Sequence, residues 1–146
     1  MYVIDASVQV SDFNAEDVHH EATRRLLQMI EAYAIPVVCP EILLPEVASA
    51  VARATDNSDL GRQLARTLRQ IPHYQIVPVE AELANLASDL AARYRIRGCD
   101  AIYVAVAYRL SIKLITWDKE QRVRAASVVK AVTPREELAA LTSSIG

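Results

Sequence analysis

The segment GCDAIYVAVAYRLSIKLITWD, residues 98–118, decides the architecture of the chain. Its residues 101–108 carry no formal charge and are apolar all round, which predicts a buried helix opened by Asp100. Residues 113–116 form a short β-rich run, and Asp118 lies at its end. A buried helix that leads into a buried strand is typical of α/β proteins.

The rest of the chain alternates in the same way between short β-rich runs and longer helical patterns. Strands are predicted at 2–4, 36–39, 74–79, 113–116 and 128–132. One helical pattern follows Asn14 as its cap and has Val18 on its apolar face, and a second contains Glu46. Two more start at Ser58 and at Glu80, and the last begins with a capping box at 133–136. This order predicts an α/β fold: an α/β/α sandwich with a short, mainly parallel central sheet. No linker or repeat divides the chain, so one domain spanning 1–146 is expected, with a flexible tail at 142–146.

Composition narrows the class of protein. The 146 residues are 52% hydrophobic and 23% charged, a balance that supports one sizeable core. The longest uncharged stretch, 70–79, is too short to cross a bilayer, and the N-terminus lacks the pattern of a secretory signal; no membrane partner and a cytoplasmic location are therefore expected. Cys39 and Cys99 have no zinc or disulfide spacing and are expected to be free thiols. The net charge of −2 does not favour binding of nucleic acid by bulk charge.

Four carboxylates stand out by their positions. Asp5 ends the first strand and Asp118 ends the strand at 113–116, so both project from the same edge of a parallel sheet. Glu46 lies close to the apolar stripe of its helix, and Asp100 opens the most apolar helix. Each has an ordinary structural explanation: Asp100 and Asp118 as helix N-caps, Asp5 in a βα turn, and Glu46 paired with an arginine.

Considered together, these carboxylates indicate a cation site. Partly buried carboxylates at two strand ends and two helix starts would repel one another unless a positive charge neutralises them. Mg²⁺ or Mn²⁺, which prefer oxygen ligands, are the simplest choice. Such an ion lowers the pKa of a bound water and stabilises the charge that develops during phosphodiester hydrolysis.

Four motifs around these carboxylates resemble those of PIN domains. They are VIDAS at 3–7, EVASA at 46–50, GCDA at 98–101 and LITWD at 114–118, and they occur in the family's order over nearly the whole chain. The resemblance is to the VapC-type toxins, the ribonucleases of toxin–antitoxin pairs. It implies catalysis and Mg²⁺ or Mn²⁺ binding by Asp5, Glu46, Asp100 and Asp118, with Ser7 and Thr116 orienting waters or carboxylates. It also implies an RNA substrate, a homodimer, and a cognate antitoxin protein whose tail blocks the acidic pocket.

Two features depart from the family pattern. Some members carry a further acidic residue after the last aspartate; here Glu120 is the only candidate, which leaves the number of metal ions open. Trp117 is unusually large for its position, and it is interpreted either as a core residue or as a platform for base stacking.

Arginines supply nearly all the positive charge of the chain. Arg62, Arg66 and Arg69 form one helical stripe, either a solvated face or a contact for RNA or antitoxin. A second group precedes Asp100 and is a candidate for RNA phosphate binding; it comprises Arg93, Arg95 and Arg97.

The sequence therefore predicts a metal-dependent endoribonuclease that hydrolyses RNA with a metal-activated water, the toxin of a type II toxin–antitoxin system. The alternative is a non-catalytic PIN-like module that binds nucleic acid or protein. An aspartate-nucleophile phosphatase is disfavoured because Ser7 stands where such an enzyme has a second aspartate. The sequence does not identify the RNA target.

Overall fold

A five-stranded, all-parallel sheet forms the centre of the chain. The computed structural model describes residues 1–146, and the order in the sheet is β3-β2-β1-β4-β5. The strands are β1 (Tyr2–Ile4), β2 (Val37–Pro40), β3 (Tyr74–Val77), β4 (Lys113–Ile115) and β5 (Ala131–Val132). The helices are α1 (Ala6–Phe13), α2 (His20–Ala32), α3 (Leu43–Thr55), α4 (Ser58–Gln70), α5 (Ala81–Tyr94), α6 (Gly98–Leu110), α7 (Lys119–Ala125) and α8 (Pro134–Ile145). The α/β sandwich expected from the sequence is confirmed.

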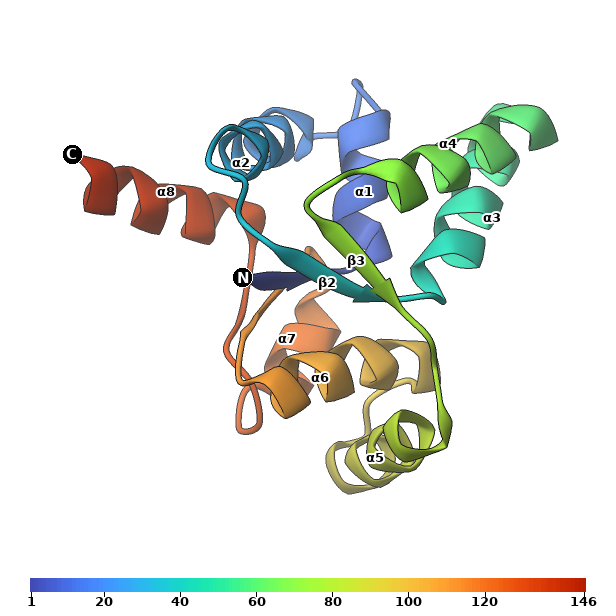
Figure 1. The fold of residues 1–146 in the computed structure, drawn as a ribbon, viewed down its shortest axis with the longest axis vertical. Coiled ribbons are helices and arrows are strands. Elements are labelled where there is room, and N and C mark those ends of the chain that lie inside the picture. The colour runs from blue at the N-terminus through green and yellow to red at the C-terminus, as the bar shows by residue number, and fades with distance from the viewer.

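Helices cover both faces of the sheet. In Figure 1, α1 to α4 lie on one side of it and α5 to α7 on the other. Helix α8 packs beside α2 and extends away from the sheet with the C-terminus at its tip. No helix is both long and apolar enough to span a membrane.

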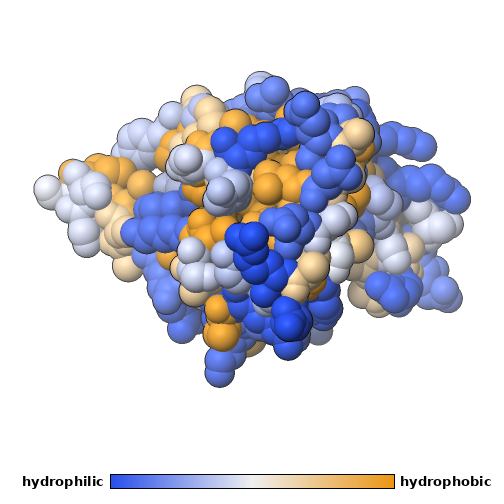
Figure 2. Space-filling view, turned by 90° about the horizontal axis from the view of Figure 1, so that it is seen from below, coloured by the Kyte–Doolittle hydropathy of each residue, from blue (hydrophilic) through white to orange (hydrophobic).

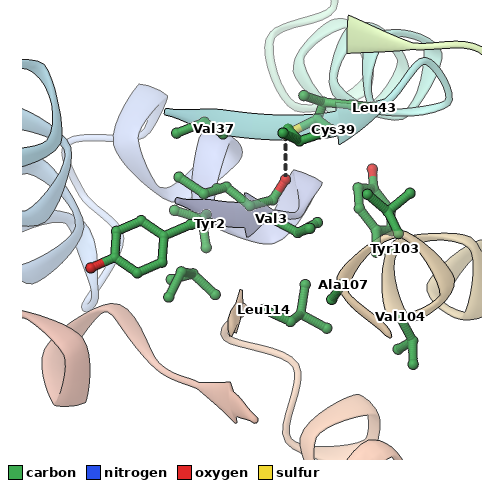
Figure 3. Packing of buried hydrophobic residues seen from close by; sticks show 14 of the residues in the cluster. Tyr2, Val3, Val37, Cys39, Leu43, Tyr103, Val104, Ala107 and Leu114 are labelled. Carbon is green, nitrogen blue, oxygen red and sulfur yellow. Dashed lines mark hydrogen bonds between the residues drawn. The ribbon is translucent and has the colours of Figure 1, made fainter. Parts of the chain in front are cut away.

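The strands and α6 supply the centre of the core. Strands β1 and β2 are buried along their whole length, as expected for parallel strands covered on both faces. Six residues of α6 are buried, so this helix lies against the sheet, where it contacts β1, β2 and β4. Figure 3 shows Tyr103 and Ala107 of α6 on the side of the helix that faces the strands, with Ala107 beside Leu114. The thiol of Cys39 donates a hydrogen bond to the Ile4 carbonyl at 3.1 Å, which ties β2 to β1.

The two cysteines are free, as predicted. Cys39 is buried and Cys99 is exposed. Burial raises the pKa of the Cys39 thiol to about 12, so it remains protonated and able to donate.

A close approach of α3 and α4 depends on Gly61. A Cβ at this position would lie 2.4 Å from the carbonyl oxygen of Ala48, which is a backbone atom and cannot easily move. The absence of a side chain at Gly61 therefore sets how closely the two helices pack.

The first helical pattern differs from its prediction. Helix α1 was not anticipated, and Asn14 ends it rather than starting the next helix: the Asn14 amide donates to the Val10 carbonyl at 3.0 Å. Helix α2 begins only at His20, after turns in which Asp17 accepts a hydrogen bond from the amide of His19. Val18 is 83% exposed instead of lying on an apolar face.

The C-terminal elements differ less. The last strand covers only 131–132, because residues 126–129 form turns after α7. The capping box at Thr133 and Glu136 is confirmed, and α8 continues to Ile145, so 142–145 belong to its last turns.

Candidate active site

The sheet places a crevice between β1 and β4. After β1 the chain builds β2 and β3 on one side of β1, and then returns to add β4 and β5 on the other. In open α/β sheets, the carboxyl ends of the strands at such a reversal are the usual site for ligands. Asp5 follows β1 directly, and Asp118 follows β4 after two residues.

The four predicted carboxylates share one cavity at this edge. The cavity has a volume of about 440 Å³, and its lining includes Asp5, Glu46, Asp100 and Asp118. They come from four different places in the fold: the β1–α1 turn, the first turn of α3, the first turn of α6 and the N-cap of α7. Folding therefore brings together residues that are up to 113 positions apart, Asp5 and Asp118.

Asp5 is the most buried of the four and is held from both sides. Only 4% of the residue is exposed. One carboxylate oxygen accepts hydrogen bonds from the Ser7 amide at 3.1 Å and the Ser7 hydroxyl at 2.6 Å, and the other accepts from the Thr116 hydroxyl. The same two hydroxyls accept bonds from the backbone beyond β4: Ser7 Oγ from the Trp117 amide and Thr116 Oγ1 from the Asp118 amide, both at 3.0 Å. Ser7 and Thr116 thus join the ends of β1 and β4 around Asp5.

Glu46 is positioned by a tyrosine that the sequence did not single out. The hydroxyl of Tyr103 donates to Glu46 Oε1 at 2.6 Å. Burial raises the pKa of Tyr103, so its hydroxyl stays protonated and can donate. Tyr103 lies three residues after Asp100, so a helical spacing was the only available signal for its place in the site. Glu46 pairs with this hydroxyl and not with an arginine.

Arg97 connects the other two carboxylates. Its Nε donates to Asp100 at 3.0 Å, and its terminal nitrogen donates to Asp118. The side chain of Arg97 is 61% exposed, whereas the side chains of Asp100 and Asp118 are 19% and 23% exposed. Both carboxylates raise the pKa of Arg97, which keeps its positive charge at the mouth of the cavity.

The cavity favours protonation of Asp5, Glu46 and Asp100. Burial raises the pKa of Asp5 to about 6, against the lowering effect of the hydrogen bonds from Ser7 and Thr116. Burial also raises the pKa of Glu46 and of Asp100, and for Asp100 the guanidinium of Arg97 opposes this effect. The main cause of all three shifts is burial, and repulsion from neighbouring carboxylates adds to it.

The donor set fits a hard divalent cation. The lining contributes carboxylate and hydroxyl oxygens, the ligands that Mg²⁺ and Mn²⁺ prefer. No three His, Cys, Asp or Glu side chains already converge on one point as a preassembled ion site. The hydrogen bonds explain this: Arg97 holds Asp100 and Asp118, and Tyr103 holds Glu46. The residues fit such an ion once Arg97 moves aside.

The helix-cap interpretation is confirmed for Asp118 and wrong for Asp100, while Asp5, expected in a turn, is also a helix cap. Asp5 caps α1 and Asp118 caps α7, where it accepts from the Gln121 amide at 3.0 Å. Both therefore stabilise a helix start and also line the cavity. Asp100 is the third residue of α6 and is not its cap, so no helix end accounts for its carboxylate.

The predicted basic residues lie in different surroundings. Of Arg93, Arg95 and Arg97, only Arg97 lines the acidic cavity. Arg95 ends α5 in the left-handed region and donates to the Ala92 carbonyl at 2.7 Å, while Arg93 is exposed. The stripe of Arg62, Arg66 and Arg69 on α4 is exposed to solvent.

Trp117 is partly buried, and two contacts hold its side chain. Its indole Nε1 donates to the Thr23 hydroxyl at 2.8 Å, and its ring stacks on His19 with 3.9 Å between the ring centroids. The stacking partner comes from the turn before α2, which the sequence predicted to be helical.

Comparisons with known proteins agree with this geometry. The PIN domain family model matches residues 2–126. Among solved structures, VapC20 of Mycobacterium tuberculosis, described as a toxin that cleaves the sarcin–ricin loop, is 21% identical, with 89% of this chain and 98% of that chain covered and a TM-score of 0.72. FitAcB of Neisseria gonorrhoeae is 20% identical over 92% and 98% of the two chains, with a TM-score of 0.70. A toxin–antitoxin complex from Klebsiella pneumoniae is 21% identical over 92% and 98%, with a TM-score of 0.67.

No curated protein sequence is significantly similar to the chain. At these identities the structural matches establish the shared fold, and the family model, which spans most of the chain, establishes the family. The chain belongs to the PIN domain family.

Proposed function

We propose that this protein is a metal-dependent endoribonuclease, the toxin of a type II toxin–antitoxin pair. The observation that carries the proposal is the cavity at the carboxyl ends of β1 and β4, where four carboxylates from distant parts of a PIN fold meet. The similar structures support the choice of substrate and partner, since one is described as a toxin that cleaves the sarcin–ricin loop and another as a toxin–antitoxin complex.

The carboxylates Asp5, Glu46, Asp100 and Asp118 would hold Mg²⁺ or Mn²⁺. A bound divalent ion supplies positive charge that makes a water molecule more acidic and stabilises the charge that develops on the phosphate. Ser7 and Thr116 fix both oxygens of Asp5, so this ligand needs no reorganisation to bind. Asp5 binds an ion as the carboxylate, and burial, which raises its pKa to about 6, opposes its ionisation in the ion-free site.

Arg97 and Tyr103 prepare the remaining carboxylates. Tyr103 orients Glu46 through a hydroxyl that stays protonated, and it excludes water behind Glu46 because its ring is buried in the core (Figure 3). Arg97 neutralises Asp100 and Asp118. Once released from them, its exposed guanidinium is placed to contact a phosphate of the RNA at the mouth of the cavity.

Two partners belong to this proposal. A cognate antitoxin would inhibit the protein by covering the acidic cavity, and a second copy of the chain would form a homodimer. The face formed by α5 to α7 carries a patch of hydrophobic residues surrounded by hydrophilic ones (Figure 2). Tyr108 and Leu110 of α6 are exposed, which is consistent with a partner on this side of the molecule.

The second candidate is a PIN-like module that binds nucleic acid or protein without cleaving it. It is favoured by the absence of a preassembled ion site and by the presence of Arg97 on two of the four carboxylates. In that case Arg97 would be a permanent replacement for the ion.

An RNA cleavage assay distinguishes the two. Wild-type protein is incubated with RNA in Mn²⁺ or in EDTA, beside the variants Asp100→Asn and Asp89→Asn. Asp89 is exposed on α5 outside the cavity and provides the matched control. The proposal predicts cleavage by wild type and Asp89→Asn in Mn²⁺ alone, and none by Asp100→Asn. No cleavage of RNA by any of the three proteins, with or without metal, would support the non-catalytic module.

A further inference from the structure

A second hollow opens beside the acidic cavity. Its volume is about 650 Å³, which is within the range of pockets that hold small ligands such as a nucleoside. The two hollows share Ala6, Ser7 and Glu46 in their linings, so they adjoin each other. The catalytic proposal assigns no role to the rest of this lining.

A stacked aromatic pair forms part of the lining. The rings of His19 and Trp117 are parallel to within 10°, with 3.9 Å between their centroids. Trp117 is fixed by its indole bond to Thr23 and by its backbone bond to Ser7. Trp117 is therefore held in place before any ligand arrives, and both side chains are only partly buried.

Polar groups in the hollow lack partners. The Nδ1 atom of His19 is buried and forms no hydrogen bond. Arg53, in the last turn of α3, is exposed, lines the hollow and forms no salt bridge. The aromatic face and the free guanidinium are complementary to a base and to its phosphate, whereas the buried Nδ1 atom is not accessible to a ligand.

We infer that this hollow is a nucleobase subsite, which takes one unpaired nucleotide next to the phosphate that is cleaved. The inference rests on the proposed ribonuclease function. The base stacks against the His19–Trp117 pair, and Arg53 contacts the phosphate of the same nucleotide. A base in a duplex is unavailable for such stacking, so the substrate class is single-stranded RNA or the loop of a folded RNA. Stacking tolerates every base, so this subsite selects unpaired RNA and not a particular sequence.

The only tryptophan of the chain is in this subsite, which makes its fluorescence a direct probe. Asp100→Asn protein in Mg²⁺ is titrated with a short unstructured oligoribonucleotide, and with the same strand annealed to its complement. We expect the single strand to change the Trp117 emission and the duplex to leave it unchanged. Adding His19→Ala should weaken binding about 5-fold to 150-fold, the range for loss of one stacked base.

Two further variants test the details. His73→Ala removes a histidine that also contacts an aromatic ring, but lies outside the hollow, and should bind as the parent does. Arg53→Gln should reduce the dependence of log Kd on log salt by about 0.7, the value for one phosphate contact to a single strand. Neither substitution touches a buried core residue, so both proteins should fold.

The failure of this inference is separable from the failure of the proposed function. If wild type cleaves RNA but single strands leave the Trp117 emission unchanged, or His19→Ala binds with the parent's affinity, the subsite is refuted while the nuclease stands. If wild type cleaves no RNA, the proposed function fails, and emission changes specific for single strands would still support the subsite. Emission changes with a partner protein and not with RNA would refute the subsite and identify a protein contact.

Discussion

Replacing Arg97 with glutamine should strengthen the binding of Mn²⁺ while it destabilises the metal-free protein. The guanidinium holds Asp100 and Asp118 in the metal-free state, and an ion must displace it from both. Because Arg97 is 61% exposed, each of these ion pairs contributes only about 0.2–1 kcal/mol. Removing both competitors should therefore tighten Mn²⁺ binding by about 2-fold to 30-fold.

Calorimetric titration with Mn²⁺ at about pH 7.5 measures this change directly. Arg66→Gln is the matched control, because Arg66 is exposed on α4, has the same charge and lies outside the acidic cavity. Thermal unfolding in EDTA should give a lower midpoint for Arg97→Gln than for Arg66→Gln, since two carboxylates lose their cation. An Arg97→Gln protein that binds Mn²⁺ no more tightly than wild type would show that Arg97 does not compete with the ion.

Three other perturbations test the fold and the site. Gly61→Ala should lower the free energy of unfolding by about 1–3 kcal/mol, as measured in urea, because the new methyl group meets the Ala48 carbonyl. Unchanged stability would mean that α3 and α4 can move apart to accommodate the methyl group at no cost. Tyr103→Phe keeps the ring but leaves Glu46 without its donor, and should cost about 1–3 kcal/mol in the same assay. Asp5 has a raised folded-state pKa, so its stabilising contribution is complete below about pH 4 and is lost as the pH rises through about 6. In EDTA the contribution of Asp5 to this loss is about 3 kcal/mol, so the urea unfolding of wild type should lose about that much more stability than Asp5→Asn, in which Glu46 and Asp100 still titrate; an equal loss in both proteins would contradict the assignment.

Much of the fold follows from local patterns. The β-rich runs and the apolar helix at 101–108 predicted the parallel sandwich, because a strand buried on both faces has a composition that few other elements share. Helix α1 was missed because its buried face contains polar groups. Gln9 donates to Tyr74, and Ser11 pairs with Thr23 and donates to Asp17; these partners lie outside the helix and are not visible as partners in the sequence.

The candidate site was predictable to a similar degree. Asp5 and Asp118 were predicted to lie in the site because each comes at the end of a strand in a parallel sheet. Glu46 and Asp100 were included because the four carboxylates would repel one another without a cation and because all four lie in motifs of the family. The partners of these carboxylates were not predictable, because they depend on the rotation of α6 and on the turn before it. That turn directs Arg97 into the cavity, while Arg95, only two residues earlier, binds backbone carbonyls at the end of α5.

The most direct test of the metal centre is to locate Mn²⁺ in crystals of the protein by anomalous scattering. The account predicts a peak in the cavity between Asp5, Asp100 and Asp118, with the Arg97 guanidinium moved away from both of its present partners. A fully loaded crystal with no peak in this cavity, and with Arg97 still bound to Asp100 and Asp118, would contradict it.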